Sequence, residues 1–95
     1  MIIYHAILKV KKDLRNNYLN DIKNSNMIPE FLNQPGCVFY TMGASLMDDD
    51  SVIVCDAWED RTTFETHCKS AIVQETWNSL QKKYVTEVDN RTYDF

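Results

Sequence analysis

A strand gives way to a helix within residues 52–70, which read VIVCDAWEDRTTFETHCKS. The apolar run from Val52 to Ala57, interrupted by one aspartate, predicts a strand that stops near Trp58. Asp60 is a candidate for the N-cap of a helix, because its carboxylate can accept hydrogen bonds from the first free backbone N–H groups. The chain is therefore expected to leave a sheet and enter a helix at this point.

Two helices are expected after this strand. The first presents an aromatic ring, an imidazole and a thiol at helical spacing, carried by Phe64, His67 and Cys68. Ser70 is a candidate cap for a second, longer helix, whose apolar stripe repeats every three or four residues at Val73, Trp77, Leu80 and Tyr84. Both helices have faces suited to burial.

The rest of the chain predicts three more strands and one earlier helix. Residues rich in aliphatic and β-branched side chains place the strands at Ile2 to Val10, Cys37 to Met47 and Val85 to Tyr93. An amphipathic helix follows the first strand, with apolar positions Leu14, Tyr18, Leu19 and Ile22, and Pro29 is expected to break or restart it. The predicted order is β-α-β-β-α-β.

That order belongs to the ferredoxin-like class of α+β folds, in which helices pack on one face of an antiparallel sheet. Ninety-five residues suffice for a single domain, 1–95, but leave much surface exposed unless a partner covers it. A second copy of the same sheet would cover the open face. We therefore expect a homodimer with the two sheets face to face, a dimeric α+β barrel.

Composition excludes several kinds of partner. A net charge of -4 opposes binding to phosphate backbones, so no nucleic acid is expected. No segment approaches the roughly 20 apolar residues of a membrane span, so we expect no membrane partner and a cytoplasmic location. Three cysteines, Cys37, Cys55 and Cys68, match no zinc-ligand spacing and are interpreted as free thiols, with a redox or metal role as the alternative.

Nearly end to end, the chain resembles the antibiotic biosynthesis monooxygenase family of dimeric α+β barrel proteins. The similarity rests on Leu8-Lys9-Val10, on Gln34-Pro35-Gly36-Cys37, on Trp58-Glu59-Asp60, and on Phe64, His67 and Ser70. In that family the pocket lies between the sheet and the helices. The resemblance implies that seven residues surround it here: Ala6, Gly43, Val54, Trp58, Phe64, His67 and Trp77.

The resemblance implies a cofactor-independent monooxygenase that uses dioxygen to oxidise a small aromatic, phenolic or quinol-like substrate, without flavin or metal. Without a cofactor the substrate itself supplies the electrons, so the protein must ionise it and exclude water. His67, with a reference pKa of about 6.5, is the candidate catalytic base, and Trp58 is a second catalytic candidate that positions the ring. Substrate-binding roles are then expected for Ala6, Gly43, Val54, Phe64 and Trp77.

Two other functions stay open. The same cavity could serve a non-catalytic module that binds a hydrophobic metabolite, and His67 could be a structural residue satisfied by backbone or water. Haem-degrading members of the family carry an Asn, a Trp and an axial His at positions that correspond here to Ala6, His67 and Trp77. Because an indole is no ordinary axial base, a haem-binding or haem-degrading monooxygenase is the less favoured alternative.

Overall fold

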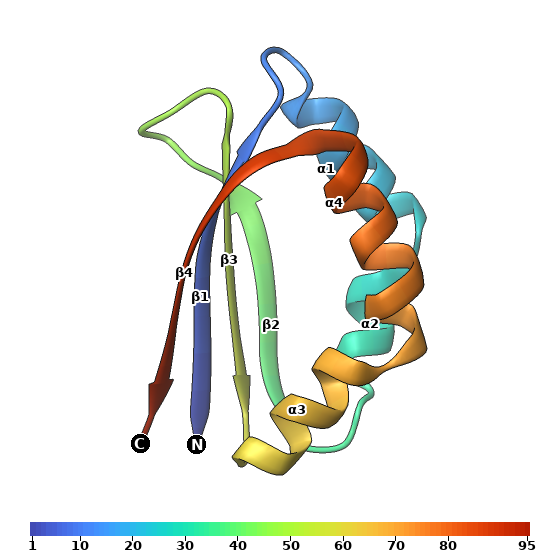
Figure 1. The fold of residues 1–95 in the computed structure, drawn as a ribbon, viewed down its shortest axis with the longest axis vertical. Helices are drawn as coiled ribbons and strands as arrows, with labels where there is room; N and C mark the ends of the chain where they lie inside the picture. Colours follow the sequence, from blue (N-terminus) through green and yellow to red (C-terminus); the bar gives the residue numbers. More distant parts are fainter.

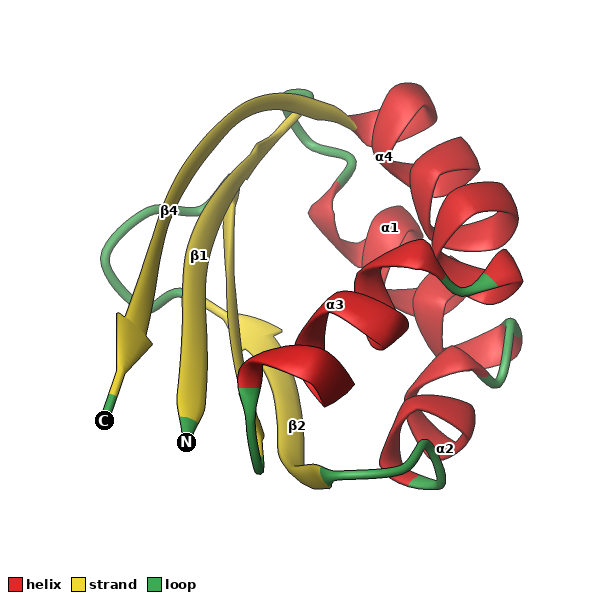
Figure 2. Cartoon of the chain, turned by 60° about the horizontal axis from the view of Figure 1, so that its bottom comes forward, coloured by secondary structure: helices red, strands yellow, loops and turns green.

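The computed structural model describes residues 1–95 and shows one four-stranded antiparallel sheet with all helices on one face (Figures 1 and 2). The strands lie in the order β2-β3-β1-β4. Their bounds are β1 (Ile2–Val10), β2 (Cys37–Ala44), β3 (Ser51–Trp58) and β4 (Val85–Asp94). The helical segments are α1 (Arg15–Asn24), α2 (Met27–Leu32), α3 (Arg61–Lys69), η1 (Ile72–Trp77) and α4 (Asn78–Tyr84). This is the predicted ferredoxin-like α+β fold.

The pairing register assigns each strand residue to a face. Ala6 pairs with Val54 and Met42 pairs with Val54, so alternate residues of the three strands share the face that the helices cover. On β1 and β3 this inner face is almost fully buried, with Ile2, Ala6, Leu8, Val10, Val52, Val54, Asp56 and Trp58 each at most 2% exposed. The opposite, outer face carries no helix (Figure 2).

The β2–β3 connection begins earlier than predicted. The sequence predicts that the second strand continues to Met47, but β2 ends at Ala44. Arg15 explains the difference, because its guanidinium donates hydrogen bonds to the backbone oxygens of Ser45, Asp48 and Ser51 and so holds the connection as a loop. A contact from a distant helix is invisible in the local pattern.

After α1 the chain begins a new helix, α2, two residues before Pro29 and not at the proline itself. Asn26 adopts a left-handed backbone with φ of 61°, which ends α1 and begins α2. Pro29 then lies within the first turn of α2, where backbone N–H groups have no partner within the helix, so the proline costs no hydrogen bond.

The second helical region is also divided. Asp60 caps α3 as predicted, because its side chain accepts a hydrogen bond from the Thr63 backbone N–H. In return the Thr63 hydroxyl oxygen accepts a hydrogen bond from the Asp60 backbone N–H, which completes a capping box. Ser70 ends α3, with an extended backbone and a hydroxyl that donates to the His67 carbonyl. The expected single helix beyond it is a π-helical segment, η1, followed by α4. Such π segments are rare and occur often at functional sites.

One close approach fixes α3 against the turn before β2. Gly36 has φ of 80°, and a Cβ at this position would lie 2.5 Å from the Thr63 side chain. Its carbonyl also accepts a hydrogen bond of 2.8 Å from the Glu59 N–H. Only glycine fits here, and this contact holds the start of α3 beside the sheet. No helix of the chain has the length and apolar character to cross a bilayer.

Candidate active site

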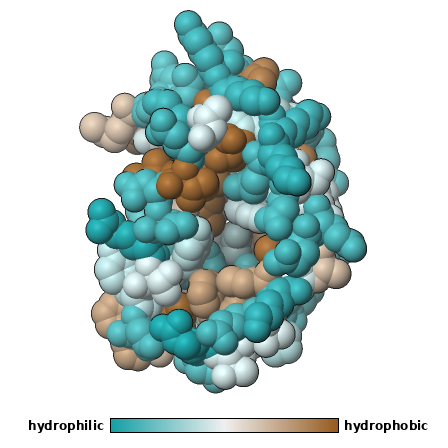
Figure 3. Space-filling view, viewed as in Figure 1, coloured by the Kyte–Doolittle hydropathy of each residue, from teal (hydrophilic) through white to brown (hydrophobic).

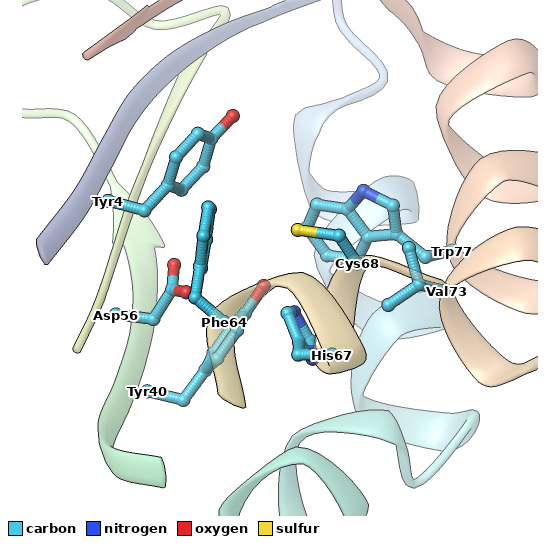
Figure 4. Close-up of a pocket in the computed structure, with 8 residues that line it drawn as sticks. All are labelled: Tyr4, Tyr40, Asp56, Phe64, His67, Cys68, Val73 and Trp77. Carbon is cyan, nitrogen blue, oxygen red and sulfur yellow. The ribbon is translucent and has the colours of Figure 1, made fainter. Parts of the chain in front are cut away.

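An apolar cavity of about 150 Å³ lies between the inner face of the sheet and the helices (Figure 4). The sheet contributes Tyr4, Tyr40 and Asp56, α3 contributes Phe64, His67 and Cys68, and η1 contributes Val73 and Trp77. Figure 3 shows hydrophobic residues gathered around a hollow between the sheet side and the helix side. A cavity of this size holds one benzene-sized ring.

His67 stands in the helix wall of this cavity, held on two sides. Its Nδ1 lies 2.6 Å from Oε1 of Gln34, and its ring stacks on Trp58 with centroids 4.4 Å apart. Since the amide oxygen can only accept, Nδ1 carries the proton and Nε2 keeps a free lone pair. Burial lowers the pKa of His67 to about 4, so the imidazole is neutral at pH 7.

Trp58 lies behind His67 rather than on the cavity surface. Its side chain is fully buried, and its indole Nε1 donates a 2.7 Å hydrogen bond to Oδ2 of Asp56. The indole therefore connects His67 and Asp56, with the imidazole on its face and the carboxylate at its edge. Trp58 is placed to position both groups.

Asp56 is the one charged residue in the cavity wall. It is 1% exposed, and its second oxygen, Oδ1, is buried without any hydrogen-bond partner. Burial raises the pKa of Asp56 to about 6, although the hydrogen bond from Trp58 works in the opposite direction. No Lys or Arg forms a salt bridge with this carboxylate, and Asp56 is one of the residues that line the cavity.

The other polar groups of the wall remain protonated. Burial, aided by the charge of Asp56, raises the pKa of the Tyr40 hydroxyl far above its usual value, and Figure 4 shows that hydroxyl pointing toward the cavity. Burial likewise raises the pKa of the Cys68 thiol, so this cysteine lacks the thiolate that a nucleophile requires. No group of three or more His, Cys, Asp or Glu side chains is arranged to hold a metal ion.

The structure brings together three of the seven residues that the resemblance placed around the pocket. Phe64, His67 and Trp77 line the cavity, and Trp58 supports it from behind. Ala6 and Val54 are paired on the inner face but belong to the packed core and do not line the cavity. Gly43 pairs with Ile53 on the outer face, where no heavy atom lies within 4 Å of the place that a Cβ would occupy, so it also stands apart from the cavity.

Five lining residues were not among the predicted site residues: Tyr4, Tyr40, Asp56, Cys68 and Val73. Asp56 could have been found from the sequence, because it shares strand parity with Val54 and Trp58 and so had to face the helices. A carboxylate on a buried face is unusual enough to mark a site. Tyr4 shares strand parity with Ala6 and could have been found in the same way. Tyr40 depends on the register of β2, which the sequence does not fix.

Comparison with known proteins agrees with this architecture. The family described as antibiotic biosynthesis monooxygenase matches residues 1–78. No curated protein matches the chain.

Solved structures share the fold at low sequence identity. A candidate antibiotic biosynthesis monooxygenase from Nitrosomonas europaea is 17% identical, with a TM-score of 0.86 over 100% of this chain and 98% of that one. A similarly described protein from Deinococcus radiodurans is also 17% identical, with a TM-score of 0.84 over 100% and 92%. A conserved protein from Methanosarcina mazei is 22% identical, with a TM-score of 0.84 over 97% and 89%. On the family match, which covers most of its length, the chain belongs to the antibiotic biosynthesis monooxygenase family.

Proposed function

We propose that this protein is a cofactor-independent monooxygenase of small, single-ring aromatic compounds that carry a hydroxyl group, such as hydroquinones. The observation that supports it is an aromatic cavity of about 150 Å³ with two buried proton acceptors, Asp56 and His67, in its wall. Family membership supports the oxygenase class, and the cavity volume supports a substrate of one ring.

The chemistry requires an electron-rich ring held away from bulk water. In the proposed complex the substrate lies among Phe64, Val73 and Trp77, and a hydroxyl group reaches an acceptor in the wall. His67 contributes the lone pair of Nε2, while Gln34 and Trp58 keep its ring in place. Loss of the hydroxyl proton makes the ring a better electron donor to dioxygen, which is the step that the protein promotes.

The size of the cavity argues against haem. A porphyrin contains four pyrrole rings, whereas the volume of about 150 Å³ accommodates one six-membered ring. Trp77, whose indole cannot act as an ordinary axial base, also occupies part of the wall. A haem titration that produces no Soret band would agree with this argument from size.

We also propose that two copies pair through the outer faces of their sheets. Apolar side chains lie there in register, with Phe39, Ala57, Ile3 and Tyr93 in one row across the four strands. Ile53 and Ile7 pair in a second row and are 38% and 41% exposed. A second copy of the same sheet would bury this apolar surface, because in a two-fold dimer the same rows of side chains from each copy pack against each other.

Oxygen uptake tests the proposed activity. Purified protein with chelator present is given hydroquinone, methylhydroquinone and the two-ring 1,4-dihydroxynaphthalene, and dioxygen consumption is followed with an electrode. We expect turnover of the single-ring compounds above the autoxidation rate, and at least a tenfold loss in His67→Ala, the lower range for removing a group that assists proton transfer. Absence of turnover, with a hydrophobic compound copurifying unchanged, would instead support the metabolite-binding function.

A further inference from the structure

The unpaired oxygen of Asp56 is the feature of the cavity that the protein itself does not explain. A neutral acceptor would satisfy the indole N–H of Trp58 equally well, yet the chain places a carboxylate there. Only Oδ2 is used, and Oδ1 is buried with no partner. Buried carboxylate oxygens without partners are rare in folded proteins because burial removes their hydration.

The position of Asp56 relates this oxygen to the cavity. Asp56 lies on the inner face of β3, paired with Tyr40 on β2 and Tyr4 on β1, and all three residues line the cavity. Figure 4 shows its carboxylate on the sheet side, beside Phe64, with His67 on the opposite, helix side. Both acceptors therefore belong to the wall of the same cavity, one on the sheet and one on α3.

We propose that Asp56 is the residue that recognises the hydroxyl group of the ligand, with Oδ1 as the hydrogen-bond acceptor and, during oxidation, as the acceptor of that proton. Only the proton transfer depends on the proposed function; the recognition of the hydroxyl group does not. In that step the O–H bond of the substrate breaks, a new bond forms between the proton and Oδ1, and the electron pair stays on the substrate oxygen. The anion then reduces dioxygen, the co-reactant of the proposed reaction: one oxygen atom enters the ring and the other leaves as water. The substrate supplies all four electrons and two hydrogens, so that hydroquinone becomes a hydroxyquinone.

The other polar groups near the cavity agree with this role for Asp56. Trp58 fixes the carboxylate through Oδ2, which leaves Oδ1 as the only free oxygen. The Tyr40 hydroxyl and the Cys68 thiol stay protonated and so cannot receive the proton. His67 remains the weaker base of the two acceptors at neutral pH, because its pKa is about 4 and that of Asp56 is about 6.

A pair of ligands that differ only in the hydroxyl group tests the proposal. 4-Fluorophenol and 4-fluorotoluene have nearly the same shape, resist oxidation under the assay conditions and can be titrated by ¹⁹F NMR. Wild type should prefer 4-fluorophenol, and Asp56→Asn should reduce that preference by about 10- to 100-fold, the range for a hydrogen bond to a charged group. Asp49→Asn is the matched control, since Asp49 is exposed in the β2–β3 loop, and it should keep the full preference.

Acidity provides a second readout that a purely structural role of Asp56 would not change. In wild type the preference should fall as the pH drops through about 6, because protonated Asp56 is a weaker acceptor. In Asp56→Asn the preference should be flat across that range. Circular dichroism confirms that the variant is folded.

Failure of this inference can be separated from failure of the proposed activity. If wild type shows no preference for 4-fluorophenol, binds neither ligand, or retains its preference in folded Asp56→Asn, the role of Asp56 is refuted whatever the oxygen uptake. If the preference depends on Asp56 but hydroquinones consume no dioxygen, the recognition role stands and the monooxygenase proposal fails.

Discussion

The two faces of one sheet have opposite characters in this molecule. The inner face is buried under helices and packs around two titratable groups, Asp56 and His67, that burial holds away from their usual pKa values. The outer face has no cover and exposes Ile7, Ile53 and Phe39. Because successive strand residues point to opposite faces, the eight residues of β3 supply side chains alternately to the inner and the outer surface. Under the two proposals above, the inner face would hold the substrate and the outer face would hold the second copy.

Truncating one aromatic residue on each face should give the largest difference in the free energy of unfolding between the inner and the outer face. Trp58→Ala removes a fully buried ring that stacks on His67, and should lower the free energy of unfolding by about 3–5 kcal/mol. Phe39→Ala on the outer face, where the ring is 38% exposed, should cost less than half as much. Urea denaturation followed by circular dichroism, at a concentration where the protein is monomeric, measures both. Equal losses would contradict the assignment of the core to one face.

A charge on the outer face should act on association rather than on the fold. Ile53→Lys would place one lysine from each copy in the proposed face-to-face interface, and should weaken dimerisation by about 100-fold through the burial of charge and the loss of apolar contact. Sedimentation equilibrium provides the measurement. Leu46→Lys is the control, because Leu46 is fully exposed in the β2–β3 loop and should leave the dimer intact. A wild-type protein that stays monomeric at high concentration would remove the proposed role of the outer face.

The inner face should reveal itself in the pH dependence of stability. The pKa of Asp56 is raised from 3.8 to about 6, so its contribution to stability is present below 3.8 and is lost as the pH rises through about 6. The pKa of His67 is lowered from 6.5 to about 4, so its contribution is present above 6.5 and is lost as the pH falls through about 4. Between these values the two effects oppose each other.

Removing one group should expose the effect of the other. In Asp56→Asn the stability should rise with pH between about 4 and 6, by up to about 1.4 kcal/mol per pH unit relative to wild type. In His67→Gln the slope should change in the opposite direction. Chemical denaturation at several pH values measures these slopes. Parallel curves for wild type and both variants would show that the two groups have ordinary pKa values.

The helix that carries Phe64 and His67 depends on its N-cap, and this should produce the smallest effect. Asp60→Ala removes the acceptor for the Thr63 N–H and should cost about 1 kcal/mol, within the usual range for cap removal. Thermal unfolding checks the value, with Glu59→Ala as the neighbouring exposed control. A loss no greater than that of the control would mean that the capping box does not stabilise α3.

The sequence predicts the fold well where local patterns agree with tertiary structure. The bounds of β1, Ile2–Val10, and the capping role of Asp60 are confirmed, because apolar runs and cap chemistry act locally. The predicted end of β2 is wrong because Arg15, far away in the chain, holds the following loop. The π-helical segment is not predicted either, since the spacing of Val73 and Trp77 fits either type of helix.

The candidate site is less accessible to sequence reasoning. Phe64, His67 and Trp77 line the cavity, but Trp58 lies behind it and Gly43 lies on the other face. Strand parity separates Gly43 from Met42 only after the register of β2 is known, and a register shift occurs near Cys37. Strand parity places Asp56 on the inner face from the sequence alone. The missing hydrogen-bond partner of its Oδ1 depends on tertiary packing, which only the three-dimensional structure shows.

The position of a bound ring tests the account most directly. A crystal structure of the protein grown with hydroquinone under anaerobic conditions should show one ring between Phe64 and Trp77, with a hydroxyl group within hydrogen-bond distance of Oδ1 of Asp56. A cavity that remains empty at saturating hydroquinone, or a ring bound only on the outer face, would contradict the central claim that the inner face holds the substrate.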